Sequence, residues 1–130
     1  MAKKILIIED EPLVARVYEK SLKFKEYDVI SARNGKDGLD LIKKEKPDLV
    51  LLDVMMPEMN GMQVLEEAMT DPETKNIPIV MLSNLSGRHD AELALSKGAV
   101  EYWVKKDAKP LDLGTKIEEL LSKTASNNVD

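Results

Sequence analysis

The chain has 130 residues, enough for one domain with its own core and too few for two. Its formal net charge of −5 weakens any case for direct binding of nucleic acid, and the lack of cysteine excludes disulfides and thiolate metal sites. The apolar run after Lys4 is too short for a signal peptide or a membrane span, so we expect a cytoplasmic protein that does not act in a membrane.

The first part of the chain alternates between unbroken apolar runs and segments of helical periodicity. Ile5–Ile8 predicts a buried strand, and a helix that opens at a proline is expected over 12–25. The apolar face of that helix is expected to hold Leu13, Val14, Val17, Tyr18 and Leu22. A short strand is predicted at 29–32, and the next helix, with Gly38 allowing close approach to the sheet, ends before Pro47.

The central stretch of the chain is Leu49–Leu52, four apolar residues without alternation. Such a run fits a strand buried on both faces, as in a parallel sheet covered by helices. Asp53 closes the run. Because a carboxylate is costly to bury unpaired, Asp53 should leave the strand at its end and face water, a cation or a partner. Pro57 then stops any helix, and Asn60-Gly61 supplies a tight turn.

The rest of the chain continues the alternation. We predict a helix around 64–69, a strand at 77–82, a helix around 91–97 with Ala91, Ala94 and Leu95 inward, a strand at 101–104 and a last helix over 110–122. Trp103 should point to the opposite sheet face from Tyr102, as a packing residue. Residues 1–122 are predicted to form the domain, and 123–130 a polar, frayed C-terminal tail.

Strands that alternate with helices predict an α/β fold with a parallel sheet and right-handed crossovers. The flavodoxin-like, doubly wound (βα)5 sandwich of strand order 2-1-3-4-5 is one of the common solutions. In that order the first and third strands are neighbours, so Glu9 and Asp10 should lie beside Asp53. Ser83 and Lys105 should reach the same edge from the fourth and fifth strands.

Three carboxylates at one edge of a sheet repel one another, and at least one would take up a proton without compensation. A hard divalent cation removes this conflict, and oxygen ligands without histidine or cysteine favour Mg2+. Lys105 adds a positive charge and Ser83 a hydroxyl. The arrangement suits phosphoryl transfer, with Asp53 as the nucleophile that becomes an aspartyl phosphate.

These segments resemble the response-regulator receiver domain of two-component signalling, the class to which chemotaxis response regulators belong, over nearly the full chain. The matching pieces are Ile5–Pro12, Pro47–Pro57 with Asn60-Gly61, Met81–Ser83, and Gly98-Ala99 followed by Tyr102 and Lys105. The resemblance implies a phosphoprotein whose Asp53 accepts a phosphoryl group from a histidine kinase or a histidine phosphotransfer protein. Such a domain catalyses its own Mg2+-dependent phosphorylation and its slow dephosphorylation, and turns over no external substrate.

The resemblance also implies roles for the other residues of the site. Asp10 would bind Mg2+ directly, Glu9 through water, and Met55 through its carbonyl oxygen. Lys105 would pair with the phosphoryl group.

The implied switch begins at Ser83, which would hydrogen-bond to the phosphoryl group and shift inward. Tyr102 would follow, changing the face built from the fourth helix, fifth strand and fifth helix. That change would alter binding to a downstream protein or to an output domain outside this chain.

The sequence departs from the family at several of these positions. Proline usually follows the lysine, with a cis bond before it, whereas here Lys106 follows Lys105. A cis bond to a non-proline residue costs about 3 kcal/mol, so the loop either carries that strain or takes a trans path. The position of Lys105 depends on this path, and Lys106 is the alternative residue for pairing with the phosphoryl group. Glu9 replaces the commoner aspartate, and Ser83 stands where threonine is frequent.

Two apolar residues flank the position of the phosphoryl group in this resemblance. Met55 and Leu85 follow Asp53 and Ser83 by two residues each, and neither side chain can position an attacking water. We therefore expect slow autodephosphorylation.

Two other kinds of protein fit parts of the pattern. An interaction module with this fold that is never phosphorylated is favoured by Lys106, but the intact acids and Lys105 argue against it. A flavin- or nucleotide-binding protein of similar fold lacks support, because no Gly-x-Gly-x-x-Gly follows the first strand and no Walker-type loop is present.

Overall fold

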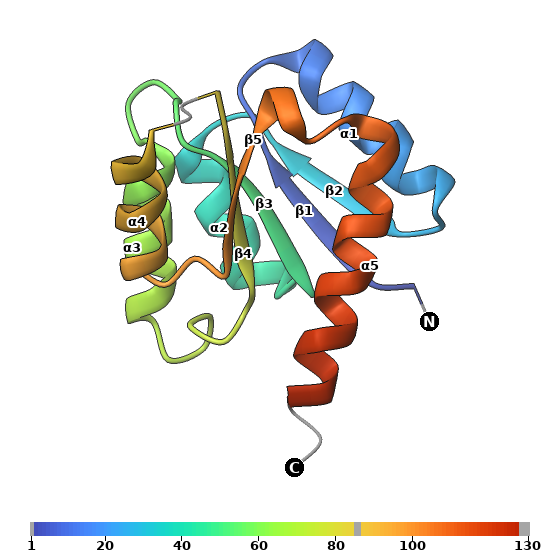
Figure 1. The fold of residues 1–130 in the computed structure, drawn as a ribbon. Helices are drawn as coiled ribbons and strands as arrows, with labels where there is room; N and C mark the ends of the chain where they lie inside the picture. Colours follow the sequence, from blue (N-terminus) through green and yellow to red (C-terminus); the bar gives the residue numbers. More distant parts are fainter. Residues whose placement is uncertain (1, 85–86, 128–130) are drawn as a thin grey trace.

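A computed structural model describes residues 2–84 and 87–127, and in these residues strands and helices alternate (Figure 1). The strands are β1 (Lys4–Ile8), β2 (Asp28–Ala32), β3 (Leu49–Asp53), β4 (Ile79–Ser83) and β5 (Glu101–Val104). The helices are α1 (Pro12–Phe24), α2 (Gly35–Glu45), α3 (Gly61–Thr70), α4 (Arg88–Ser96) and α5 (Pro110–Asn127), and a 3-10 turn, η1 (Lys105–Asp107), follows β5.

The five strands form one parallel sheet in the order β2-β1-β3-β4-β5. This order confirms the predicted flavodoxin-like fold. The pairing of Ile8 with Leu52 fixes the register of β1 against β3, so the residues that follow these two leave the sheet side by side. The loops after β1, β3 and β5 gather at the upper end of the molecule in Figure 1.

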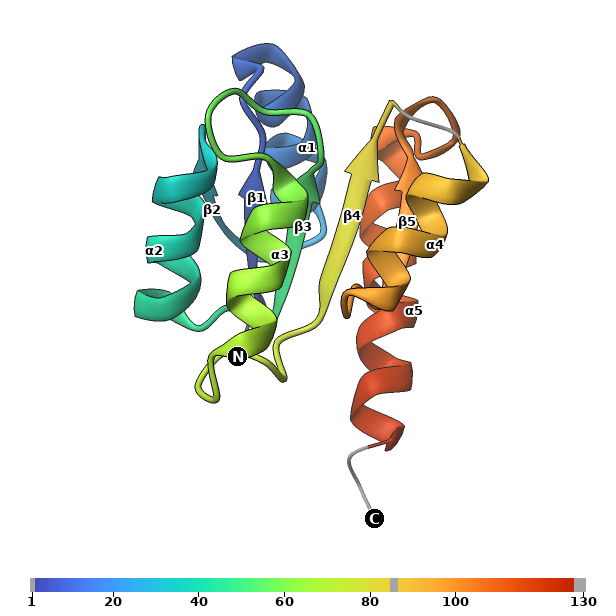
Figure 2. The ribbon, with the colours of Figure 1, turned by 90° about the vertical axis from the view of Figure 1, so that its left-hand side faces the viewer.

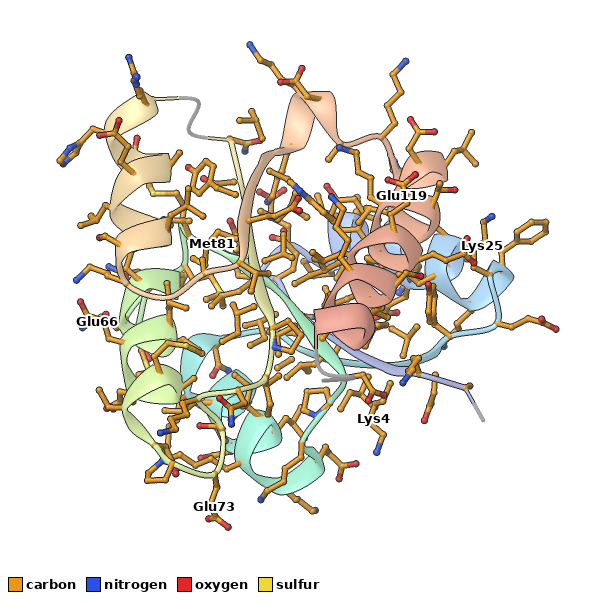
Figure 3. The ribbon with its side chains drawn as sticks, turned by 60° about the horizontal axis from the view of Figure 1, so that its bottom comes forward. Lys4, Lys25, Glu66, Glu73, Met81 and Glu119 are labelled. Atoms are coloured by element: carbon orange, nitrogen blue, oxygen red, sulfur yellow. The ribbon has the colours of Figure 1, made fainter. Side chains whose placement is uncertain are left out.

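Two layers of helices enclose the sheet, as the turned view shows (Figure 2). Helices α1 and α5 cover one face, where Tyr18, Leu51 and Ile117 belong to one buried apolar cluster. Helices α2, α3 and α4 cover the other face, whose core includes Met81. Figure 3 shows Met81 among the side chains of the interior, while Glu66 and Glu73 lie at the periphery. The continuous apolar strands predicted from the sequence are therefore buried on both sides.

Local features of the sequence explain where the helices begin and how closely they pack. Asn60 accepts a hydrogen bond from the Gln63 backbone, and Gln63 returns one to the Asn60 backbone, which forms a capping box at the start of α3. Gly38 lies against the sheet, since a Cβ there would be 2.5 Å from Ile8 Cδ1. The close helix–sheet contact expected at Gly38 is confirmed.

The structure corrects three details of the sequence analysis. Leu13 and Val17 do not belong to the core face of α1, because they are 75% and 49% exposed. Leu95 is likewise exposed on α4. Helix α5 continues to Asn127, beyond its predicted end near Ser122; residues 128–130 lie outside the described residues. No helix in the described residues combines the length and the apolar character needed to cross a membrane.

Candidate functional site

An acidic cluster lies at the carboxyl edge of the sheet, where β1 and β3 end side by side. One carboxylate oxygen from each of Glu9, Asp10 and Asp53 lies within 4.8 Å of the others. Glu9 and Asp53 are 2% and 5% exposed, and Asp10 is partly buried. The sequence analysis predicts this juxtaposition from the strand order.

Lys105 enters the cluster from the turn after β5. Its Nζ lies 2.6 Å from Glu9 Oε1 and 3.6 Å from Asp53 Oδ1, and its side chain is 10% exposed. The Lys105–Lys106 peptide bond is trans, as are the other peptide bonds of the described residues. The trans path still delivers Lys105 to the site, while Lys106 is exposed. Lys105, and not the alternative Lys106, therefore supplies the ammonium group.

The electrostatics of the cluster are unfavourable for the charged form of Asp53. Burial, and after it the charge of Glu9, raise the pKa of Asp53 to about 7, although Lys105 and the Met55 N–H oppose the shift. Burial acts to lower the pKa of Lys105, but its hydrogen bond with Glu9 and the nearby carboxylates outweigh burial and raise it. One ammonium for three carboxylates leaves an excess of negative charge.

The loop after β3 holds Asp53 in place through backbone contacts. The N–H of Met55 donates a 3.3 Å hydrogen bond to Asp53 Oδ1, and the N–H of Gly61 donates to the carbonyl of Val54. The Met55 side chain is 60% exposed, beside the acceptor carboxylate in sequence. Leu85, the other apolar residue that the sequence analysis links to slow dephosphorylation, lies outside the described residues.

Ser83 and Tyr102 meet beneath the edge of the sheet. Ser83 is fully buried at the end of β4, and Tyr102 reaches it from the neighbouring strand β5. Burial raises the pKa of the Tyr102 hydroxyl, and a hydrogen bond with the Ser83 side chain opposes that shift. Trp103 packs on the opposite face with α1 and α5, as predicted. The two residues of the predicted switch are therefore in contact.

Two features of the site are absent from the sequence analysis. Glu9 Oε1 pairs with Lys105, and Glu9 Oε2 accepts a hydrogen bond from the Glu11 N–H at 3.1 Å. Tyr18 of α1 is buried, and burial raises the pKa of its hydroxyl. The charges of Lys105, Glu9 and Asp53 also act on that pKa, so Tyr18 lies near the cluster. In the sequence, the contact of Glu9 with Lys105 is indicated only by the extra methylene that glutamate has relative to aspartate.

The donor set fits a hard divalent cation. Three carboxylates converge without histidine or cysteine, and oxygen ligands are those that a hard divalent cation prefers. Because Asp53 is buried, water compensates its charge poorly, and a dication would neutralise the excess negative charge. The residues that could hold such an ion are Glu9, Asp10 and Asp53, each of which offers one carboxylate oxygen.

The comparisons with known proteins identify the family. The model of the response regulator receiver domain matches residues 5–118, so the chain belongs to this family of phosphorylatable switches of two-component signalling, whose members typically bind a divalent metal. A relative from Porphyridium aerugineum, named "Probable transcriptional regulator ycf27", is 40% identical over 128 residues. That match covers 96% of this chain but 52% of the relative, so the chain spans about half the length of that protein.

Solved structures agree with this assignment. A CheY-like response regulator receiver domain protein from Methanospirillum hungatei JF-1 is 28% identical with a TM-score of 0.90, and the match covers 98% of this chain and 100% of that one. The Mn(2+)-bound form of response regulator Rcp1 is 27% identical, with a TM-score of 0.78 and coverage of 90% and 92%. The phosphorylated cyanobacterial phytochrome response regulator RcpA is 26% identical, with a TM-score of 0.82 and coverage of 95% and 96%.

Proposed function

We propose that Asp53 accepts a phosphoryl group from the phosphohistidine of a histidine kinase or a histidine phosphotransfer protein. The observation that carries this proposal is the meeting of Asp53 with Glu9, Asp10 and Lys105 at one edge of the sheet. An Asp53 carboxylate oxygen would attack phosphorus as the phosphorus–nitrogen bond breaks, and the imidazole would leave with the bonding electron pair. Lys105 would neutralise charge on the transferred oxygens.

Mg2+ is the ion we propose for the site. Asp10, Asp53 and the Met55 carbonyl would hold it, with Glu9 in contact through water. When bound, the ion would neutralise negative charge on the phosphoryl oxygens and the carboxylates. Support comes from the all-oxygen donor set and from the Mn(2+)-bound form of the related Rcp1.

The response to phosphorylation would begin at Ser83, which we propose donates a hydrogen bond to the phosphoryl oxygen. Its present partner, Tyr102, would then rearrange and alter the face formed by α4, β5 and α5. The target would be a downstream protein or an output domain outside this chain; the relative named as a transcriptional regulator is about twice as long as the matched part.

Residues 1–122 would serve as the receiver domain and 123–130 as a polar tail, of which the part up to Asn127 continues helix α5. The cytoplasm is the proposed location, in keeping with the lack of cysteine.

The test is phosphorylation of the purified domain by a small phosphodonor. Incubation with Mg2+ and phosphoramidate should give a hydroxylamine-labile adduct that peptide mapping assigns to Asp53, and Asp53→Asn should give none. The alternative, an interaction module that is never phosphorylated, would be supported if no adduct formed under conditions that phosphorylate another receiver domain.

A further inference from the structure

We propose that Glu9 is the positioning residue of Lys105, whose ammonium group it holds away from Asp53 until the metal ion and the phosphodonor arrive. The inference rests on the proposed function and adds to it a division of labour among the three acids. Glu9 binds the lysine, and Asp10 and Asp53 are left to receive the cation.

The contacts of Lys105 carry this inference. Its Nζ makes a hydrogen bond of 2.6 Å with Glu9 Oε1, whereas its distance to Asp53 Oδ1 is 3.6 Å, an ion pair without a hydrogen bond. The lysine is therefore held by Glu9, and its interaction with the acceptor carboxylate is the weaker of the two. A charge-assisted hydrogen bond of this length is strong where solvent is excluded.

The second oxygen of Glu9 is also occupied. Glu9 Oε2 accepts the N–H of Glu11 at 3.1 Å, in the turn that leads into α1. One Glu9 carboxylate oxygen accepts from the backbone and the other from Lys105, so both oxygens are hydrogen-bonded, and Glu9 is 2% exposed. A buried carboxylate with both oxygens engaged is poorly placed to turn toward a cation, whereas Asp10 is partly exposed at the mouth of the cluster.

The length of the Glu9 side chain is essential to this role. Aspartate at this position would be shorter by one carbon–carbon bond, about 1.5 Å. It would keep the negative charge beside the metal site but could not reach Lys105 and the Glu11 N–H together. Released from Glu9, the ammonium would move onto Asp53, only 3.6 Å away, and compete with the cation for that carboxylate.

Glu9→Asp keeps the negative charge and shortens the side chain, so it tests whether the length of Glu9 is what positions Lys105. The metal-free protein is prepared with 13C,15N-labelled lysine, and the side-chain resonance of Lys105 is assigned by its loss in Lys105→Met. We expect Glu9→Asp to shift this resonance more than Asp53→Asn does. A larger change from Asp53→Asn, with none from Glu9→Asp, would overturn the inference. The indole N–H resonance of Trp103, which donates to Glu101 away from the cluster, reports whether each variant keeps its fold.

Binding of Mg2+ measured by calorimetry provides the second arm. Glu9→Asp should weaken binding about three- to tenfold in the presence of Lys105, and less than about twofold when combined with Lys105→Met. Equal weakening in both backgrounds would show that Glu9 acts only through its water-mediated contact with the metal and not through Lys105, against the inference. If the unaltered domain neither binds Mg2+ nor accepts a phosphoryl group, the proposed function fails, and the metal-free resonances still decide whether Glu9 holds Lys105.

Discussion

Gly61 lies directly against the backbone carbonyl of Asp53, and a Cβ at position 61 would come within 2.2 Å of that oxygen. The neighbouring atom belongs to the backbone and cannot turn aside as a flexible side chain would. The first residue of α3 thus presses on the end of β3, and the loop between them closes with the Gly61 N–H bonded to Val54. The position of the acceptor carboxylate depends on this close approach.

Gly61→Ala should therefore displace the loop after β3. We expect a loss of about 1–3 kcal/mol in the free energy of unfolding, measured by urea denaturation, and slower formation of the Asp53 adduct. Gly114→Ala is the matched control, because its Cβ would meet Lys25 Cγ at 2.5 Å, in a side chain that can move. Equal losses for the two variants would contradict the role of Gly61.

The raised pKa of Asp53 predicts a dependence of stability on pH. The pKa is about 3.9 in the unfolded chain and about 7 in the native protein, so the native state binds more protons between these values. The free energy of unfolding of the metal-free protein should fall as the pH rises from about 4 to about 7. Mg2+ should restore it at the upper end, because the cation binds the deprotonated carboxylate.

Asp53→Asn removes the titrating group and provides the control for that dependence. Above a pH of about 7 the metal-free variant should be more stable than the unaltered protein by about 1–3 kcal/mol, and Mg2+ should stabilise it less. Denaturation across this pH range, with and without Mg2+, checks both statements. Parallel pH curves for the two proteins would show that Asp53 is not the group responsible.

The lifetime of the phosphorylated form should depend on Met55. Its side chain is 60% exposed, so a polar replacement should cost little stability. Met55→Asn or Met55→Glu should speed autodephosphorylation about two- to tenfold, because either side chain can position a water. The loss of the Asp53 adduct is followed by mass spectrometry. Met55→Leu, apolar like the original residue, should leave the rate unchanged. Equal rates of autodephosphorylation for the polar and the apolar variants would refute the idea.

The two leucines of α1 should behave very differently when shortened. Leu22 is fully buried between α1 and the sheet, whereas Leu13 is 75% exposed. Leu22→Ala should cost about 2–5 kcal/mol in the free energy of unfolding, and Leu13→Ala less than about 0.5 kcal/mol. Urea denaturation measures both, and similar losses would mean that α1 packs as its apolar spacing predicts.

The order of the elements and the membership of the acidic cluster could be read from the sequence. Continuous apolar runs such as Leu49–Leu52 specify buried parallel strands, and the runs of β1 and β3 are each followed directly by an acid of the site, Glu9 or Asp53. Once the strand order is assumed, Glu9 and Asp53 must leave the sheet side by side, since parallel strands end at the same edge. These features follow from backbone geometry and periodicity, which are local properties of the chain.

Only the tertiary structure decided which atoms meet. The path of the backbone after β5 brings Lys105 to the cluster while Lys106 stays exposed, and the Lys105 ammonium lies closer to Glu9 than to Asp53. Spacing placed Leu13 and Val17 in the core, but the packing of α1 left both exposed. The reason is physical: periodicity sets the direction of a side chain about its own helix or strand. Its contacts depend on how neighbouring elements pack and on charges that arrive from distant parts of the chain.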